Sequence, residues 1–387
     1  MPMKYHLVQP QNLKSTYSEF DQLDFDLVNM GKIKLNTVRF CFTIASPSGA
    51  AGEALENATS KLNLFYDNLT GGHTFIESIT TEFTEGKKAG VIENIQSYPR
   101  YAKMAVSGTQ SALDQHNSSA VVEGRTSSYQ IVNNILRGEQ SGFKTAAGTY
   151  EADTTHRDAS FAVKPRFCLN SASSASNSPE LSMRQSGSVR VSIRLSRDAH
   201  VFFGADAAGL SYSLSNCRLT YQSVSDDGKD EAIFLNTKLN IKKSINADST
   251  QLSVRIPAVC QAVSCSFLDQ ATQNDVENTN TLDLQRPEDI SRVIFSFNDS
   301  LNRLISYELD NTVGILHHYL RSFSTDLDAN ESSIGKLKTN SSYGVGVAFD
   351  NFINLENQRF GIELQSKIGA ANKVYIMYAY FHSLISV

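Results

Sequence analysis

The adjacent histidines His317 and His318 have the side chains best suited to metal chemistry, because imidazole nitrogens are common ligands of zinc and other transition metals. Their spacing is unfavourable for a shared ion. Neighbouring side chains point about 100° apart on a helix and to opposite faces of a strand. One class of enzyme that binds its metal on neighbouring strands uses two nearby histidines and a glutamate, and the sequence contains no His-x-His. We interpret both residues as surface or interface histidines and predict no metal site.

Five cysteines are spread through the chain, and their number and spacing bear on disulfides and on zinc. They are Cys41, Cys168, Cys217, Cys260 and Cys265. An odd, widely spaced set does not form a disulfide framework. Cys260 and Cys265 have no second Cys or His pair at the spacing of a zinc site. We expect all five to pack as small apolar side chains in a reducing compartment.

A short acidic series, Asp21, Asp24 and Asp26, precedes a long strand pattern. Asp24 and Asp26 share one face of a strand and could hold a hard cation with the help of carbonyl groups. The alternative is that they face solvent or pair with Lys and Arg of a neighbouring segment, so that Phe25 and Leu27 pack inward. We favour this second interpretation.

Glycine patterns at residues 204–209 and 344–346 could indicate a phosphate-binding loop, but neither continues into Gly-Lys-Ser/Thr. We attribute them to turns. There is no Gly-x-Ser-x-Gly motif, and the eight histidines are scattered. The sequence therefore predicts neither an enzyme nor a cofactor site. A sugar-binding protein stays an alternative because 15 Tyr and 21 Phe could supply a stacking ring, although Trp is absent.

The charge and hydropathy of the chain restrict the classes of partner that it can bind. The net charge is −5, from 35 basic and 40 acidic residues, and no run of four like charges occurs. A surface that neutralises phosphates needs clustered Lys and Arg, so we expect no direct nucleic-acid binding. The longest apolar run, residues 374–381, is far shorter than the roughly 20 residues of a membrane-spanning helix. The amino terminus lacks the apolar core of a signal peptide, so we expect synthesis and assembly in the cytoplasm.

Strand-type alternation dominates the sequence. Apolar and polar residues alternate with period 2 in many short segments separated by turn residues, which is typical of a β-sandwich or a jelly roll. These segments are residues 35–44, Val189–Leu195, 216–221, 237–241, 252–256 and 293–297. Residues 374–381 are apolar on both faces, which predicts a strand that is buried on both sides.

Helical periodicity is rarer. Residues 92–105 predict a helix broken at Pro99, and the apolar positions within residues 301–309 and 315–323 predict two more. Polar segments predict long surface loops at residues 108–126, 170–179 and 269–281.

A chain of 387 residues is long for one core, since a typical domain has about 150. The clearest punctuation is the charged turn-forming cluster at residues 225–231. We place a domain boundary there. The predicted units are an amino-terminal arm, residues 1–12, a first domain, residues 13–224, and a second domain, residues 225–387.

Seven segments resemble the major capsid proteins of tailless icosahedral double-stranded DNA viruses, of the tectivirus, corticovirus and autolykivirus type. These segments are residues 16–27, 35–44, 68–76, 92–100, 161–167, Val189–Leu195 and 374–381. None is diagnostic alone, and the resemblance rests on their order and spacing. It implies an all-β chain of two tandem eight-stranded jelly rolls, a double jelly roll, with short helices and long loop insertions.

The same resemblance implies a function. Members of this family form homotrimers, which are pseudo-hexameric capsomers that tile an icosahedral shell. The implied partners are neighbouring capsomers, penton and minor capsid proteins, and an internal lipid membrane, and the implied location is the virion. The moderate length favours a bacteriophage. Two alternatives belong to other classes: a jelly-roll protein that binds carbohydrate or a receptor, and a hydrolase of sandwich type with paired carboxylates.

Overall fold

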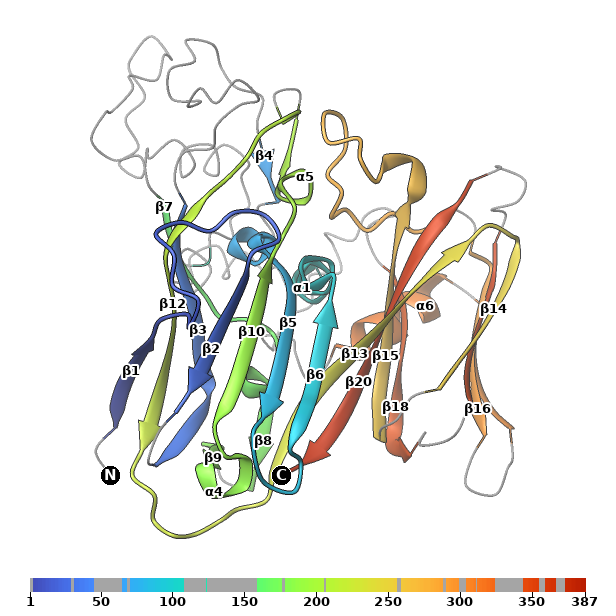
Figure 1. The fold of residues 1–387 in the computed structure, drawn as a ribbon. Coiled ribbons are helices and arrows are strands. Elements are labelled where there is room, and N and C mark those ends of the chain that lie inside the picture. Colours follow the sequence, from blue (N-terminus) through green and yellow to red (C-terminus); the bar gives the residue numbers. More distant parts are fainter. Residues whose placement is uncertain are drawn as a thin grey trace, which may run out of the picture.

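The computed structural model describes most of the chain. The described residues are 3–28, 31–44, 65–67, 70–107, 123, 159–175, 178–204, 207–255, 259–287, 290–298, 304–310, 312–323, 344–354, 359–366 and 373–387. Their strands form two β-sandwiches that stand side by side, with the amino-terminal half on one side and the carboxy-terminal half on the other (Figure 1). The amino and carboxyl ends lie at the same end of the molecule (Figure 1).

The first sandwich has a five-stranded sheet in the order β1-β12-β3-β7, with β9 also paired to β3. Its strands are β1 (Lys4–Val8), β12 (Leu214–Val224), β3 (Lys32–Ile44), β7 (Ala159–Val163) and β9 (Glu180–Ser182). The facing strands are β2 (Gln22–Leu27), β10 (Val189–Leu195), β5 (Ile76–Phe83) and β6 (Gly90–Gln96). Phe25 of β2 and Phe40 of β3 meet between these layers with ring centroids 6.2 Å apart, and Phe42 of β3 meets Phe75, the residue before β5, at 5.3 Å.

The second sandwich pairs two four-stranded layers. One layer consists of β18 (Val345–Asn354), β15 (Val259–Asp269), β20 (Tyr375–Ser386) and β13 (Ile233–Ile245). The other consists of β14 (Ser249–Arg255), β19 (Arg359–Gln365), β16 (Arg292–Asn298) and β17 (Leu304–Leu309). Phe360 and Phe381 meet between the layers with centroids 5.6 Å apart, and Phe297 and Phe349 do so at 5.5 Å.

One sheet joins both halves. β13 of the second sandwich runs parallel to β6 of the first, so a nine-stranded sheet extends in the order β18-β15-β20-β13-β6-β5-β10-β2. The short strand β8 (Ala172–Ser174) also pairs with β13. The parallel contact has a single registered pair, Leu239 with Asn94. Backbone bonds alone therefore hold this joint weakly, and side chains must add to it.

Short helices and turns complete the described structure. The α-helices are α1 (Tyr98–Ser107), α4 (Met183–Ser186), α5 (Asp198–Val201) and α6 (Thr312–Arg321). The 3-10 helices are η2 (Gly71–Phe75), η3 (Cys168–Asn170) and η4 (Gln270–Thr272). A two-stranded pair consists of β4 (Phe65–Tyr66) and β11 (Phe202–Phe203). Helix α1 lies between the two sandwiches (Figure 1).

Most of the predicted strands are confirmed. The alternating segment Val189–Leu195 is β10, and residues 35–44 form most of β3. The carboxy-terminal strand β20 lies between β13 and β15, and its residues 375–383 are all buried, as expected for a segment that is apolar on both faces. The predicted helix at residues 315–323 corresponds to α6.

Three sequence predictions were wrong. Ile92 and Ile95 lie on strand β6, and α1 starts only at Tyr98, with Pro99 in its first turn, where the missing N–H leaves no bond unmade. Leu304–Leu309 is strand β17, because pairing with β16 overrides a helix-like spacing of apolar residues. The predicted loop at residues 170–179 contains β8, which pairs with β13. Leu301 lies outside the described residues, as do nearly all of residues 108–126.

The predicted domain boundary at residues 225–231 falls in the connection between β12 and β13. The predicted arm, residues 1–12, contains β1, which pairs with β12. The division into two domains stays a prediction.

Candidate functional site at the junction of the two sandwiches

The two histidines singled out in the sequence lie on α6. Their ring centroids are 5.6 Å apart with planes at 83°, and His317 is exposed. Within the described ranges, no group of three His, Cys, Asp or Glu side chains could hold a metal ion. Among the described residues, the structure therefore brings no third metal ligand to this pair.

The acidic series before β3 is used for local pairing. Arg190 Nε donates to Asp26 at 2.9 Å, and Ser192 Oγ donates to Asp24 at 2.6 Å, both from the neighbouring strand β10. Phe25 and Leu27 are buried. This confirms the interpretation that the carboxylates pair with a neighbour while the apolar residues face the core.

The cysteines and the carboxy-terminal glycine pattern serve packing. All five cysteines are free thiols, and all but Cys41 are buried. Burial raises the pKa of the Cys217 and Cys260 thiols to about 12, which disfavours the reactive thiolate. At Gly344, an added Cβ would lie 1.9 Å from the carbonyl oxygen of Cys265. Close backbone approach, and not phosphate binding, explains this glycine.

The junction is organised around helix α1, which lies against the second sandwich. Arg100 is buried, and its guanidinium donates to the backbone carbonyls of Phe267, Thr281 and Asp283, at 3.3 Å to Phe267 and 3.4 Å to Asp283. The guanidinium also lies over the ring of Tyr378, 4.9 Å from its centroid. One side chain of the first half thus binds three carbonyls of the second half.

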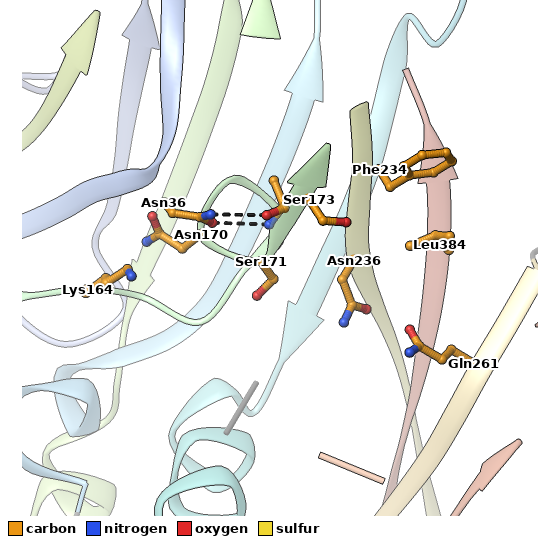
Figure 2. A pocket seen from close by; sticks show the side chains of 10 residues that line it. Asn36, Lys164, Asn170, Ser171, Ser173, Phe234, Asn236, Gln261 and Leu384 are labelled. Carbon is orange, nitrogen blue, oxygen red and sulfur yellow. Dashed lines mark hydrogen bonds between the residues drawn. The ribbon is translucent and has the colours of Figure 1, made fainter. Parts of the chain in front are cut away.

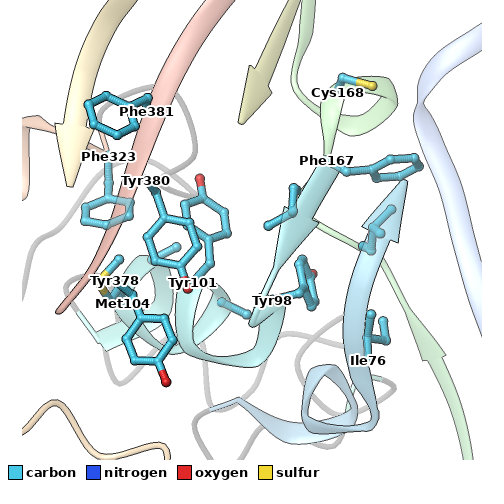
Figure 3. Packing of buried hydrophobic residues seen from close by; sticks show 14 of the residues in the cluster. Ile76, Tyr98, Tyr101, Met104, Phe167, Cys168, Phe323, Tyr378, Tyr380 and Phe381 are labelled. Carbon is cyan, nitrogen blue, oxygen red and sulfur yellow. The ribbon is translucent and has the colours of Figure 1, made fainter. Parts of the chain in front are cut away.

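An aromatic cluster surrounds Tyr101, the residue that follows Arg100 on α1. The ring centroid of Tyr101 on α1 lies 5.2 Å from that of Tyr380, 5.8 Å from that of His382 and 6.0 Å from that of Phe323. Figure 3 shows Tyr101 of α1 facing Tyr380 of β20, with Phe323 alongside. Tyr380 donates its hydroxyl to the Ser97 carbonyl at 2.9 Å, so the ring is also fixed by a hydrogen bond.

A buried carboxylate reinforces the weak β6–β13 contact. Glu93 on β6 accepts the backbone N–H of Lys238 on β13 at 2.8 Å and that of Cys168 at 2.7 Å. Burial raises the pKa of Glu93 to about 6, although the Lys238 charge and these N–H donors oppose the shift. Gln96 N also donates to Asn240 Oδ1 at 2.9 Å. Glu93 and Asn240 therefore accept backbone N–H groups that a longer parallel pairing of β6 and β13 would otherwise satisfy.

A second charge pair lies on the next turn of α1. Lys103 Nζ binds Asp67, and it lies 3.5 Å from Asp283 Oδ1. Asp67 also accepts Asn280 Nδ2 at 2.7 Å. Burial acts to raise the pKa of Asp67, but the Lys103 charge and the hydrogen bonds outweigh burial and lower it. Asp67 is therefore held ionised, and it links the first half of the chain to Asn280 of the second.

Solved structures resemble the fold over the whole chain, whereas no family model and no curated protein matches the sequence. The Faustovirus major capsid protein is similar over 100% of this chain and 90% of its own, with a TM-score of 0.56 and 7% identity. A chain of the Sputnik virophage structure is similar over 100% of this chain and 86% of its own, with a TM-score of 0.52 and 10% identity. The chain has the double jelly-roll fold. This confirms the fold class predicted from the sequence, and the two sandwiches are the first and second rolls.

A cavity of about 530 Å³ opens between the two rolls, next to the paired strands β8 and β13. One wall is formed by the segment around β8, where the Asn36 amide makes two hydrogen bonds to the Ala172 backbone at 3.1 and 3.2 Å. Figure 2 shows Phe234, Leu384 and Gln261 on the opposite wall, formed by β13, β20 and β15. The volume lies in the range of ligand pockets, roughly 300–1,000 Å³.

The sequence predicted the burial of residues 374–381, which include Tyr378 and Tyr380, but it did not identify the polar residues of the junction. Arg100 and Glu93 are ordinary surface residue types, and nothing in their local sequence shows burial. The partner of Glu93, Lys238, lies 145 positions along the chain. One signal was available in principle. Glu93 occupies an inward-facing position of β6, and a correct prediction of how β6 and β13 pair would have revealed it.

Proposed function

We propose that the protein is the major capsid protein of a double-stranded DNA virus and that it forms homotrimeric, pseudo-hexameric capsomers. The observation that carries this proposal is the likeness of the whole chain, through both rolls, to the Faustovirus major capsid protein. Three chains contribute six similar rolls to a ring, and such a ring has a nearly hexagonal outline that tiles a flat facet. The role is structural and not catalytic.

The junction geometry supports this role. A capsomer keeps its outline only if the two rolls of each chain hold a fixed orientation. Arg100 on α1 and Glu93 on β6 form buried hydrogen bonds with the second half of the chain, and Lys103 on α1 pairs with the half-exposed Asp283. Breaking a buried charge interaction typically costs about 3–5 kcal/mol, because the remaining group is left unpaired. The two rolls therefore behave as one rigid unit.

The proposal includes the finer expectations from the sequence. The partners are neighbouring capsomers, penton and minor capsid proteins, and an internal lipid membrane, and we expect no direct nucleic-acid binding. None of the helices in the described ranges is long and apolar enough to cross a membrane. The virion is the proposed location, with assembly in the host cytoplasm and a bacteriophage as the proposed virus. The proposed units are residues 1–12, 13–224 and 225–387.

Two measurements test the proposal. Light scattering of the purified protein should give three times the chain mass of 42.6 kDa. Negative-stain images should show particles with a hexagonal outline, and images of infected cells should show shells that contain the protein. A stable monomer at micromolar concentration would contradict the proposal.

A further inference from the structure

Exposed large apolar side chains are concentrated in the first 28 residues of the sequence. Ten such side chains are exposed in the described residues, and six of them precede residue 30. These six are Met3, Tyr5, Leu7, Leu13, Phe20 and Val28. Tyr5 and Leu7 on β1 are 77% and 56% exposed. Isolated exposed apolar residues are normal on protein surfaces, whereas Tyr5 and Leu7 are neighbours on the same face of β1 and can form part of a contact surface.

β1 is the terminal strand of its sheet and pairs only with β12 in the described structure. Tyr5 and Leu7 are opposite Gln222 and Thr220 of β12, and Gln222 Nε2 donates to the Tyr5 hydroxyl at 2.7 Å. The intervening His6 turns inward and stacks on the buried Tyr221, with centroids 4.7 Å apart. Both apolar side chains therefore point outward from a strand whose second edge is unpaired within the described residues, and exposed edges of this kind promote association.

The opposite end of the molecule carries a second such strand. β17 is the terminal strand of the sheet β14-β19-β16-β17, and Leu304, Ser306 and Glu308 lie on its exposed face. Leu304 is 71% exposed. Figure 1 places β1 on one side of the molecule and β14 and β16 of this sheet on the other. Each end thus presents a terminal strand with an exposed apolar side chain.

The charges at the two ends are complementary. β1 and β12 contain the exposed cations Lys4 and Arg218 and no carboxylate. β17 contains Glu308 and no cation, and the exposed Asp310 follows it. Arg292 of β16 pairs with Glu308 at 2.5 Å and offsets part of this charge. Opposite charges on facing surfaces favour correct docking and penalise the contact of like ends.

We propose that β1 of one copy packs against the β17 face of the next copy, so that a second copy of this chain covers Tyr5 and Leu7. The contact joins different surfaces of two identical chains, and such contacts form closed rings when the rotation between copies permits. The proposal rests on the proposed function, because the trimer supplies the closed ring.

Three variants test this pairing. Y5K/L7K places cations on the β1 end, L304K places one on the β17 end, and V91K, at a position that is 61% exposed on β6, is the matched control. Each is measured by light scattering, with circular dichroism and thermal melting to verify the fold. We expect Y5K/L7K and L304K each to be folded monomers, while V91K keeps the mass of the unmodified protein.

An equimolar mixture of Y5K/L7K and L304K gives the sharper result. The first retains an intact β17 end and the second an intact β1 end, so the mixture should form pairs of twice the chain mass that cannot close. Either Y5K/L7K or L304K keeping the full oligomer mass would overturn the proposed contact, as would dissociation of V91K, and in each case a trimeric unmodified protein would leave the proposed function in place. A monomeric unmodified protein would instead refute the proposed function.

Discussion

The carboxylate of Glu93 in the first roll accepts the backbone N–H of Lys238 in the second roll, at 2.8 Å. It also accepts the Cys168 N–H, so truncation of Glu93 would leave two buried donors without an acceptor. Each unsatisfied buried donor costs about 1–3 kcal/mol. We therefore expect E93A to lower the free energy of unfolding by about 2–5 kcal/mol in chemical denaturation. The exposed Glu85 provides the control, and E85A should change stability little.

The same carboxyl group should make stability depend on pH. The pKa of Glu93 is raised from 4.5 to about 6 in the folded protein, because burial disfavours the ionised form. The stability that the neutral Glu93 side chain contributes is therefore fully present below about pH 4.5, and it is lost as the pH rises through 6. Relative to E93Q, whose amide does not titrate in this range, the unmodified protein should lose on the order of 2 kcal/mol between pH 4.5 and pH 7. An unchanged difference between the two proteins across this range would contradict the assignment.

Arg100 should not be replaceable by lysine. Its planar guanidinium reaches three carbonyls and stacks on Tyr378, whereas an ammonium group has neither the fork nor the flat face. We expect R100K to lower the free energy of unfolding by about 2–4 kcal/mol, since hydrogen bonds to charged groups contribute roughly 1.5–3 kcal/mol each. R359K, at an exposed position on β19, is the control. Equal stability of the two variants would show that Arg100 does not anchor the junction.

The strands could be predicted from the sequence, but the polar contacts of the junction could not. β10 shows a strict period of 2, because one face meets the core and the other faces polar surroundings. β17 has apolar residues at a helix-like spacing, and only its pairing with β16 fixes it as a strand. The burial of Arg100 and Glu93 depends on groups contributed from distant parts of the chain. No local pattern carries that information.

The central strand β20 provides the most sensitive position for a test of the second roll. Ala379 is buried between Ile241 of β13 and Cys265 of β15. A glutamate there would bury an unpaired carboxylate, which is among the few changes that lower stability by about 4 kcal/mol or more. We expect A379E to be insoluble or largely unfolded at pH 8, and less damaged at pH 4, because burial raises the pKa of the new carboxyl and favours its neutral form. S386E, near the exposed end of the same strand, should fold normally. If A379E melted like S386E, β20 could not be the core strand between β13 and β15.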